Sequence, residues 1–484
     1  MSKIKAQAFS GILWNGFQML VNQGSAFIIK LVLAKILFPE DFGLVGMATV
    51  FIGFVQVFND LGIGAALIQR KDEELRESHF NTAFWTGVGW AILMYITICF
   101  AVAPFAASFY GEPLLESLLP VLGLGILSSP VNLVHKAQLT KKMNFKRIAL
   151  ISNSSNITSG ILSLILAFAG AGVWSLAFNS VASLVIAMPM FFAATRWIPK
   201  FQFERQAFKD VFGFGIFTTG TSIINYLISN VDYLLIGKLL SAQALGAYTF
   251  AFILTDTFRS RLMSVMNTVL YPVYSKMQNN TKSIKKYYLK VVLYNSIVVF
   301  PIMLFFIAFA DTVILDLFGA KWGEALDPLK ILSLSVMVHM MVNSNTALIR
   351  GLGKPGLEMG LQLFKAAIFL PMLYVGIVEY GVMGAAVAIL INKCIAVIIA
   401  QYTFKKLLEV KISTSEFFDA VKYPWLASIA AYAMVFVQLN FLNFHPIIAV
   451  VSLFVVYGLL IYVFLGKELK EQYWQMKQLK AIKK

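Results

Sequence analysis

The sequence predicts an all-α integral membrane protein of about 14 transmembrane helices, arranged as two six-helix repeats followed by two further helices. Three observations lead to this fold class. Of the 484 residues, 59% are hydrophobic and only 13% are charged, with a mean hydropathy of +0.76. Soluble globular proteins carry less apolar sequence. Apolar windows long enough to cross a bilayer recur along the whole chain, and part of the first half returns in the second half.

Apolar windows of about 20 residues, the length that crosses a bilayer as a helix, define the predicted spans. Loops and charged stretches separate neighbouring windows. The predicted spans begin near residues 11, 42, 80, 114, 148, 173, 211, 244, 288, 326, 356, 381, 424 and 446.

The basic residues of the chain gather on one side of the predicted membrane. With the N-terminus in the cytoplasm, the inside segments carry 31 of the 40 lysines and arginines, and the outside loops carry only Lys321. Cytoplasmic loops of membrane proteins collect Lys and Arg. The count therefore predicts that both termini are cytoplasmic, and it explains the net charge of +16 by topology, so no nucleic-acid partner is expected.

An internal repeat relates the two halves. Residues 35–46 (KILFPEDFGLVG) resemble residues 238–249 (KLLSAQALGAYT) at an offset of 203, which aligns Gly43 with Gly246. Farther on, an offset of 209 aligns Gly172 with Gly381. Because each copy holds six spans, the copies share one sidedness and are related by an axis along the membrane normal. The sequence thus predicts an N-terminal lobe (1–205), a C-terminal lobe (206–405), two appended helices (406–466) and a basic cytoplasmic tail (467–484).

The first helix of each repeat carries a polar stripe. Taking 100° per residue, the polar positions of each helix fall within one narrow arc. Lipid cannot satisfy such groups, so the stripes are expected to face the bundle or a hydrated cavity; the alternative is that they only join helices by hydrogen bonds. The stripes consist of Asn15, Gln18 and Asn22 in the first span and of Thr218, Ser222, Asn225 and Ser229 in the seventh.

Ionisable residues also lie deep within the predicted spans, where each charge costs about 2.5 to 3.5 kcal/mol on insertion scales. In the eighth span Asp256 and Arg259 are three residues apart and can neutralise each other, whereas Arg261 points elsewhere. Cations outnumber acids, so the interior is predicted to be net cationic. The deep charges are Lys30, Arg259, Arg261, Lys365 and Lys393 against Asp60, Asp232 and Asp256.

Each deep group also has a purely structural interpretation. Lys365 shares a helix face with Glu358 and Gln362 and can pair with them. Asp60 can pair with a neighbouring helix, and His339 can be a hydrogen-bonded packing residue. The four histidines are scattered without the spacing of a metal site, so no metal is expected.

The block FVQVFNDLGIGAALIQRKDEELRESHFNTAFW (54–85), together with GLVGMATVF (43–51) and IGKLLSAQALGAYTFAF (236–252), resembles a known family. It is similar to the polysaccharide transporters of the multidrug/oligosaccharidyl-lipid/polysaccharide exporter superfamily, within it most to colanic acid and teichuronic acid exporters. The resemblance runs from Ser10 to about Leu408. It implies a flippase of the bacterial plasma membrane that moves undecaprenyl-diphosphate-linked sugar repeats to the outer leaflet by alternating access.

The resemblance also implies a cationic central cavity, which agrees with the separate count of deep charges. A diphosphate favours Arg and Lys donors, and sugars favour amides and hydroxyls. We therefore expect a lipid-linked oligosaccharide as substrate, in contact with membrane lipids and polysaccharide polymerase machinery. The expected substrate-binding cations are Lys30, Arg259, Arg261, Lys365 and Lys393.

Two other functions are considered. A drug or cation antiporter of the same superfamily would be expected to have an acid-rich cavity, and a membrane polymerase or ligase would need a large outer loop with catalytic groups. The outside loops are short, so no enzyme is expected. No GxxxxGK[ST] motif supports ATP binding, which leaves no cofactor and a proton or sodium gradient, or removal of product, as the energy source. The candidates for ion coupling are Asp60, Asp232 and Asp256.

Overall fold

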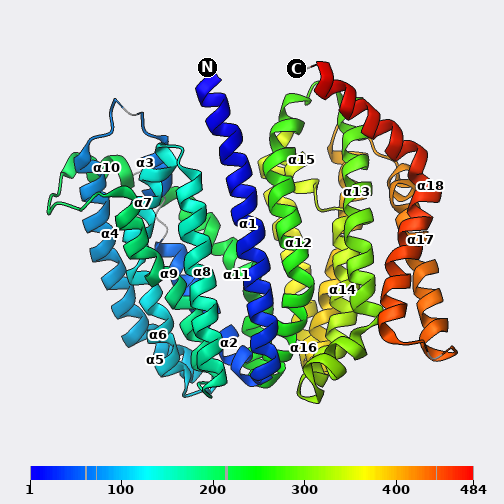
Figure 1. Cartoon of the computed structure of the whole chain (residues 1–484), viewed down its shortest axis with the longest axis horizontal. Coiled ribbons are helices and arrows are strands. Elements are labelled where there is room, and N and C mark those ends of the chain that lie inside the picture. Colours follow the sequence, from blue (N-terminus) through cyan, green and yellow to red (C-terminus); the bar gives the residue numbers. More distant parts are fainter. Residues whose placement is uncertain (1, 60–62, 72, 213–215, 443, 483–484) are drawn as a thin grey trace. The chain divides into compact units, whose positions relative to one another are not determined.

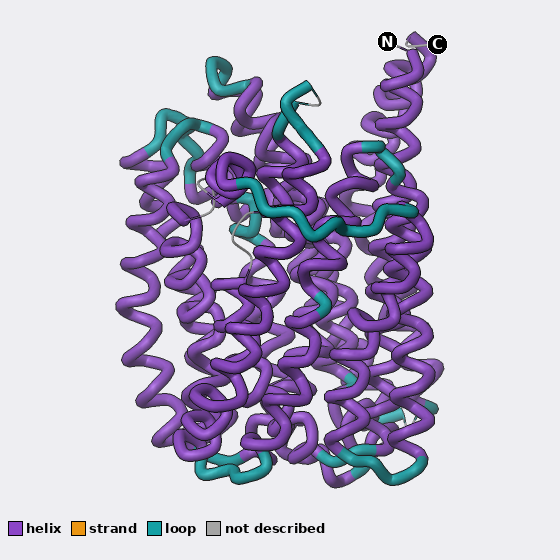
Figure 2. The backbone as a smooth tube through the Cα atoms, turned by 90° about the vertical axis from the view of Figure 1, so that its left-hand side faces the viewer, coloured by secondary structure: helices purple, strands orange, loops and turns teal. Residues whose placement is uncertain are grey.

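The computed structural model describes residues 2–59, 63–71, 73–212, 216–442 and 444–482. Every regular element in these residues is a helix, and Figure 2 shows long helices joined by loops. The all-α prediction is confirmed. The chain divides into two compact units, Met1–Phe250 and Ala251–Lys484.

Unit 1 contains helices α1 to α11 and the first turns of α12. α8 packs against α9, α1 lies along α8, and α2 contacts both α6 and α11 (Figure 1). The elements are α1 (Ser2–Ile36), α2 (Pro39–Asn59), α3 (Ile63–Gln69), α4 (Glu77–Thr97), the π-helix η1 (Ile98–Val102), α5 (Ala103–Tyr110), α6 (Leu115–Leu127), α7 (Ser129–Lys141), α8 (Phe145–Phe168), α9 (Val173–Thr195), α10 (Arg205–Phe212), α11 (Ile216–Leu239) and α12 (Ala242–Lys276).

Unit 2 contains the rest of α12 and all later elements. α13 packs against α14 and α17, and α16 packs against α14. The elements are α13 (Thr281–Ala308), the π-helix η2 (Thr312–Phe318), the 3₁₀-helix η3 (Ala320–Ala325), α14 (Leu326–Met340), α15 (Asn345–Gly351), α16 (Pro355–Tyr402), the π-helix η4 (Thr403–Leu407), α17 (Thr414–Asn440) and α18 (Pro446–Ile482).

Eleven helical segments of the described residues are long and apolar enough to cross a membrane. One of them, Pro355–Leu407, has 53 residues and bends at Gly381, so its length of about 80 Å covers both the predicted eleventh and twelfth spans. The predicted seventh and eighth spans correspond to α11 and α12, which contain residues outside the described part. The multi-pass fold is confirmed, and the total of fourteen spans stays a prediction.

The glycines aligned by the repeat adopt matching backbone conformations. Gly172, before α9, has φ 52° and ψ −131°, and Gly381, at the bend of α16, has φ 58° and ψ −139°. Only glycine adopts this region readily because it has no Cβ. Each glycine joins two consecutive spans of its repeat, so the structure has the same turn at both of the aligned positions.

A second pair of aligned glycines makes a reciprocal contact within unit 1. A Cβ on Gly43 of α2 would come within 1.7 Å of the carbonyl oxygen of Ala242, and a Cβ on Gly246 of α12 would come equally close to the carbonyl oxygen of Pro39. The offset of 203 that aligns the glycines also aligns Pro39 with Ala242. Such an exchange of equivalent contacts is the signature of a two-fold relation between the starts of α2 and α12.

The units divide at a different place from the predicted lobes. α11 and the start of α12 belong to unit 1 because α11 packs against α2 and the glycine contact joins α2 to α12. The unit boundary therefore falls within α12. The lobe boundaries drawn from the sequence repeat, at residues 205 and 405, remain a prediction.

The block at residues 54–85 holds the linker that follows α9. The Arg70 guanidinium lies 2.8 Å from Asp210, and the His79 Nε2 lies 3.4 Å from the same carboxylate. Arg76 pairs with Glu204 at 2.7 Å. Burial raises the pKa of Asp210. The interactions with His79 and Arg70 lower it by more, so the pKa of this carboxyl lies below its usual value. The polar residues of this block thus have a structural role in unit 1.

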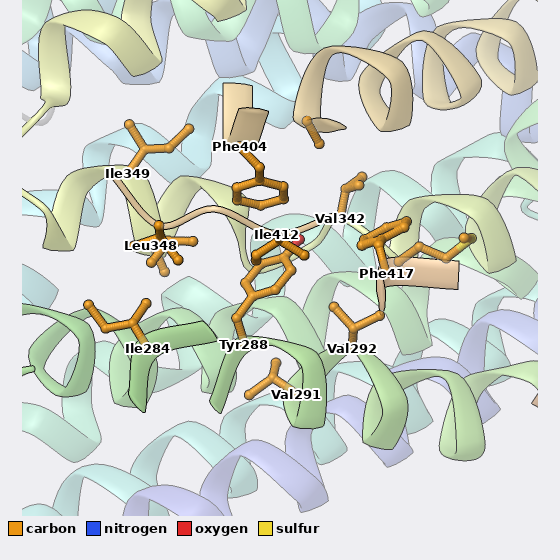
Figure 3. Packing of buried hydrophobic residues seen from close by; sticks show 14 of the residues in the cluster. Ile284, Tyr288, Val291, Val292, Val342, Leu348, Ile349, Phe404, Ile412 and Phe417 are labelled. Atoms are coloured by element: carbon orange, nitrogen blue, oxygen red, sulfur yellow. The ribbon is translucent and has the colours of Figure 1, made fainter. Parts of the chain in front are cut away.

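A buried apolar cluster of unit 2 surrounds the turn at residues 341–344, which separates α14 from α15. Figure 3 shows the Tyr288 ring of α13 facing Phe404 of η4, with Leu348 of α15 and Phe417 of α17 close by. The two ring centroids are 5.0 Å apart. This apolar cluster fixes α15 and the end of α16 against α13, and so it positions the turn between α14 and α15.

The glycine contact gives a stability prediction. Replacing Gly43 with Ala places a methyl group against a backbone carbonyl, and no side-chain rotation can relieve this clash. The free energy of unfolding should therefore fall by about 1 to 3 kcal/mol. Thermal unfolding of the detergent-solubilised protein measures the change. Gly360→Ala in α16 is the matched control, since nothing lies within 4 Å of its Cβ position. Equal melting temperatures for both variants would contradict the close contact.

Candidate functional site

The candidate site begins with an ion pair in the middle of α12. The Arg259 Nε donates to the Asp256 Oδ1 at 2.6 Å, and a second guanidinium nitrogen contacts the same oxygen. The two side chains are 20% and 18% exposed, so neither is surrounded by water. The predicted pairing across three residues of one helix is confirmed. The pair neutralises one of the deep cations of the chain.

Arg259 also reaches the end of α14. Its Nη1 lies 3.2 Å from the His339 Nδ1 and 3.0 Å from the Met263 Sδ. A guanidinium can only donate hydrogen bonds, so the His339 Nδ1 is the acceptor and the ring proton sits on Nε2. His339 is therefore a neutral ring that orients Arg259. Its hydrogen-bonded role agrees with the structural interpretation of this residue.

Each of the two legs of α16 carries a lysine whose charge acts on His339. Lys365 precedes the bend at Gly381 and Lys393 follows it, and both act electrostatically on His339 together with Arg259. Lys365 lies ten residues after the start of α16 at Pro355, which is about 15 Å of helix. This is half the thickness of the hydrocarbon core of a bilayer.

Glu358 is the acid that the sequence offered as a partner for Lys365. Its carboxylate accepts from Arg350 at 2.9 Å and from the Gln362 amide at 3.1 Å. Lys365 feels the charge of Glu358, but among the described residues it forms no ion pair within 4.0 Å. Arg350 therefore forms the ion pair with Glu358, and Lys365 is a half-buried cation without an ion pair to this acid.

We call the group formed by Arg259, Lys365, Lys393 and His339 the cationic cluster. It contains three cations, and Asp256 pairs with one of them, Arg259. A positive charge at this depth needs a partner or water. A phosphate or diphosphate fits this requirement, because guanidinium and ammonium groups donate short, strong hydrogen bonds to it.

A break in the helix lies beside the cationic cluster. α14 ends at Met340, and α15 begins at Asn345 after four residues in turn conformation. Asn343 and Ser344 of this turn are buried, and the hydroxyl of Tyr288 bonds the side chain of Asn345. Non-helical backbone at membrane depth is tolerated where it is packed in protein or lines a cavity. Such broken spans are where transporters place their binding sites.

The other predicted site residues lie on other elements. Lys30 is exposed on α1, which belongs to unit 1. Asn22 donates to the Ser152 hydroxyl of α8 at 3.0 Å, which is the helix-joining role, and Gln18 is half-buried. Asn225 and Ser229 are exposed on α11. The remaining sites lie outside the described part of the structure: the side chains of Asn15, Arg261, Thr218 and Ser222, and the whole of Asp60.

Asp232 has a defined partner in unit 1. Its side chain is 7% exposed and accepts a short hydrogen bond from the hydroxyl of Tyr248, sixteen residues farther along in α12. This bond joins α11 to α12 near the reciprocal glycine contact. Among the described residues no group of three or more His, Cys, Asp and Glu side chains is placed to hold a metal ion.

Sequence reasoning missed the part that His339 and the helix break play in the site. The signal was present in VNSNTA (342–347), where Asn343, Ser344 and Asn345 follow one another inside an apolar span. These residue types favour turns because their side chains bond nearby backbone groups.

Comparison with known proteins identifies the class. The chain belongs to the polysaccharide biosynthesis protein family, whose match covers residues 32–327. Among its relatives, the lipopolysaccharide biosynthesis protein WzxC of Escherichia coli (strain K12) is 23% identical over 409 residues, which are 83% of this chain and 82% of WzxC. The teichuronic acid biosynthesis protein TuaB of Bacillus subtilis (strain 168) is 26% identical over 389 residues, 78% and 77% of the two chains. The expected family resemblance is confirmed.

A solved structure shares the fold. The lipid II flippase MurJ in its inward closed conformation superimposes with a TM-score of 0.73, at 14% sequence identity, over 95% of this chain and 100% of MurJ. At this identity the likeness concerns the fold alone. The agreement over nearly the whole chain supports the multi-pass helical fold predicted from the spans.

Proposed function

We propose that this protein is a flippase that carries lipid-linked polysaccharide repeat units from the inner to the outer leaflet of the bacterial plasma membrane. Alternating access moves the sugar and its diphosphate across, while the polyprenyl chain stays in lipid. Membership of the polysaccharide biosynthesis family and the likeness to WzxC and TuaB, a lipopolysaccharide and a teichuronic acid biosynthesis protein, support this substrate class. On the outer face the repeat unit would pass to polymerase machinery.

The observation that carries this proposal is the cationic cluster. Arg259, Lys365 and Lys393 act on one half-buried ring, with Asp256 as the acid that pairs with Arg259. A group with three cations and one acid suits a diphosphate better than a cationic drug, which would need an excess of acids. The drug antiporter is disfavoured for this reason.

The sidedness follows from the distribution of basic residues. The inside segments defined from the sequence hold 31 of the 40 lysines and arginines, so both termini are assigned to the cytoplasm. Two of these segments, residues 69–79 and 196–210, contact each other in unit 1 through the Arg70 and Arg76 ion pairs. Segments that meet in this way lie on one side of the membrane, as the assignment requires.

The Asp256–Arg259 pair offers a route to ion coupling. A substrate phosphate that engages Arg259 competes with the Asp256 carboxylate for the same donors. A carboxylate that loses its cation inside a membrane is costly to keep ionised, so it takes up a proton. Substrate binding and proton uptake are thereby linked at one helix. We propose Asp256 as the first of the three candidate acids, ahead of Asp232, which Tyr248 engages.

Deletion of the gene tests the function. Lipid-linked oligosaccharide should accumulate in the cytoplasmic leaflet, because synthesis continues without export. Extraction and mass spectrometry quantify the lipid, and resistance to an added glycosidase in spheroplasts reports its leaflet. A plasmid copy of the wild-type gene is the control. Unchanged surface polysaccharide and no accumulation in the deletion strain would refute the proposal.

Variants of the cationic cluster test the phosphate role. Arg259→Ala should reduce export roughly 10- to 100-fold, since a hydrogen bond to a charged group contributes about 1.5 to 3 kcal/mol. Arg259→Lys keeps the charge and should retain more activity. Lys330→Gln is the control, because Lys330 pairs with Asp311 between α14 and the start of η2. Normal export by Arg259→Ala, at equal protein level, removes Arg259 from the mechanism.

The coupling proposal has its own test. In proteoliposomes, Asp256→Asn should bind substrate but lose the response of flux to an imposed pH gradient, since an amide cannot exchange a proton. Asp232→Asn and Asp60→Asn provide the comparison. If Asp256→Asn retains full gradient-dependent flux while one of the others loses it, the coupling acid is that other residue. Gradient-independent flux in the wild type would argue against proton coupling altogether.

A further inference from the structure

The segment between α9 and α10 carries large apolar side chains that are exposed on unit 1. Ile198 is 77% exposed, Phe201 91% and Phe203 64%. The segment, residues 196–204, has no helical structure and lies at the edge of unit 1 beside α4 and α10 (Figure 1). We call it the α9–α10 linker. Single exposed apolar residues are common, but three large ones within six positions form a patch of the kind that marks an interaction surface.

Side chains of α4 bind the backbone of the linker. The Trp85 Nε1 donates to the Lys200 carbonyl at 2.8 Å, and the Lys200 N–H donates to the Asn81 side chain at 2.9 Å. Farther along, the Glu204 N–H donates to the Thr82 hydroxyl at 3.0 Å. Asn81 and Thr82 are fully buried, so these bonds are made inside unit 1. They fix the linker against α4, and the patch of apolar side chains is held in place with it.

The position of the linker along α4 sets its depth in the membrane. α4 continues through η1 and α5 as one apolar segment of 34 residues, Glu77–Tyr110, which is about 50 Å long. The hydrocarbon core is about 30 Å thick, so roughly 10 Å remain at either end. Asn81 and Trp85, which bind the linker, lie about 6 and 12 Å from the start of α4. The linker therefore lies at the boundary between headgroups and acyl chains, where water can satisfy the rest of its extended backbone.

Basic side chains accompany the apolar patch. The exposed cations of residues 196–210 are Arg196, Lys200, Arg205 and Lys209. The two acids of this stretch, Glu204 and Asp210, are paired with arginines that precede α4. Lys200 lies 3.3 Å from Glu77, and the other three cations can meet an anionic partner. Large apolar side chains next to cations are complementary to a bilayer surface that contains anionic phospholipids.

We propose that the α9–α10 linker is an interfacial anchor. Its exposed apolar side chains insert between the lipids of the leaflet assigned to the cytoplasm, and the cations beside them bind anionic phospholipid headgroups. A soluble partner protein would also cover an apolar patch, but the depth of the linker along α4 favours lipid. Because the linker is bonded to α4, the anchor holds the inner end of this span at the bilayer surface. The inference goes beyond the proposed transport, which does not use these residues.

Fluorescence quenching in nanodiscs tests the position of the linker. The full-length protein with Cys99→Ala and Cys394→Ala carries a bimane label at Phe201→Cys, and a second sample carries it at Glu73→Cys, exposed in the loop before α4. Phospholipids with a nitroxide near the start of the acyl chain should quench most of the fluorescence at position 201, and iodide in the water should not. The label at position 73 should show the reverse.

The label at position 201 also tests the choice of lipid. Spin-labelled phosphatidylglycerol should quench it more strongly than spin-labelled phosphatidylcholine at equal mole fraction, because the cations hold the anionic headgroup near the linker. Arg205→Gln with Lys209→Gln should lower the ratio of the two lipid affinities about fivefold for each cation removed. Lys282→Gln with Lys286→Gln, which removes two exposed cations of α13, is the matched control.

Other results would overturn the anchor. Quenching at position 201 by iodide instead of lipid would place the linker in water. Protection from both quenchers would mean that protein covers the patch, as in contact with a second copy of this chain. Equal quenching by the two spin-labelled lipids before any cation is removed would contradict the binding of anionic headgroups. Equal thermal unfolding of the variants and the parent protein excludes misfolding as the cause of a change.

Discussion

The cost of an ionised group in hydrocarbon is the constraint on which the organisation of this protein depends. Each deep charge must be paired, hydrated or neutralised, and the partner that does so differs from one charged residue to the next. Arg350 at the helix end forms the ion pair with Glu358, and Lys365 forms none with that acid. Asp256 pairs with Arg259, whose guanidinium also reaches His339. Among the described residues of unit 2, Arg259, Lys365 and Lys393 thus act on His339 while one acid, Asp256, pairs with the arginine. Under the proposed function, the diphosphate of the substrate would bind to these cations.

Glycine determines how the repeated spans can approach one another. At Gly43 and Gly246 the backbone of one repeat touches a carbonyl oxygen of the other, and the exchange is reciprocal. Contacts made of backbone alone leave no side chain to rearrange, so the contact between α2 and α12 cannot adjust by a change of rotamer. Asp232 and Tyr248 bond beside it and join α11 to α12. A joint of this kind can act as a fixed point for motions of the helices around it, which alternating access requires.

The helical class and the repeated glycine positions could be predicted because they rest on composition and spacing, while the net cationic interior stays a prediction. Gly172 and Gly381 could be matched from the alignment, and their unusual backbone angles agree. The grouping of Arg259 with Lys365, Lys393 and His339 could not be predicted, since it depends on the packing of α12, α14 and α16. Lys30 was predicted by the same criterion, a basic residue deep within a predicted span, yet it belongs to unit 1. Spacing along one helix reveals partners three or four residues apart, as for Asp256 and Arg259, whereas contacts between helices need the fold.

The fourth span of each repeat is interrupted, but the two interruptions differ in position and in chemistry. The offset of 209 aligns Ser128, between α6 and α7, with Met337 inside α14, whereas the turn of the second repeat lies at residues 341–344. Near Ser128 the hydrogen bonds join hydroxyls, amides and carbonyls, as between Asn59 and Ser129. The turn before α15 instead follows His339, whose ring accepts from Arg259. Duplication accounts for the shared span, but the contact with a charged side chain depends on residues of the second repeat alone, and this is why the repeat could not predict the candidate site.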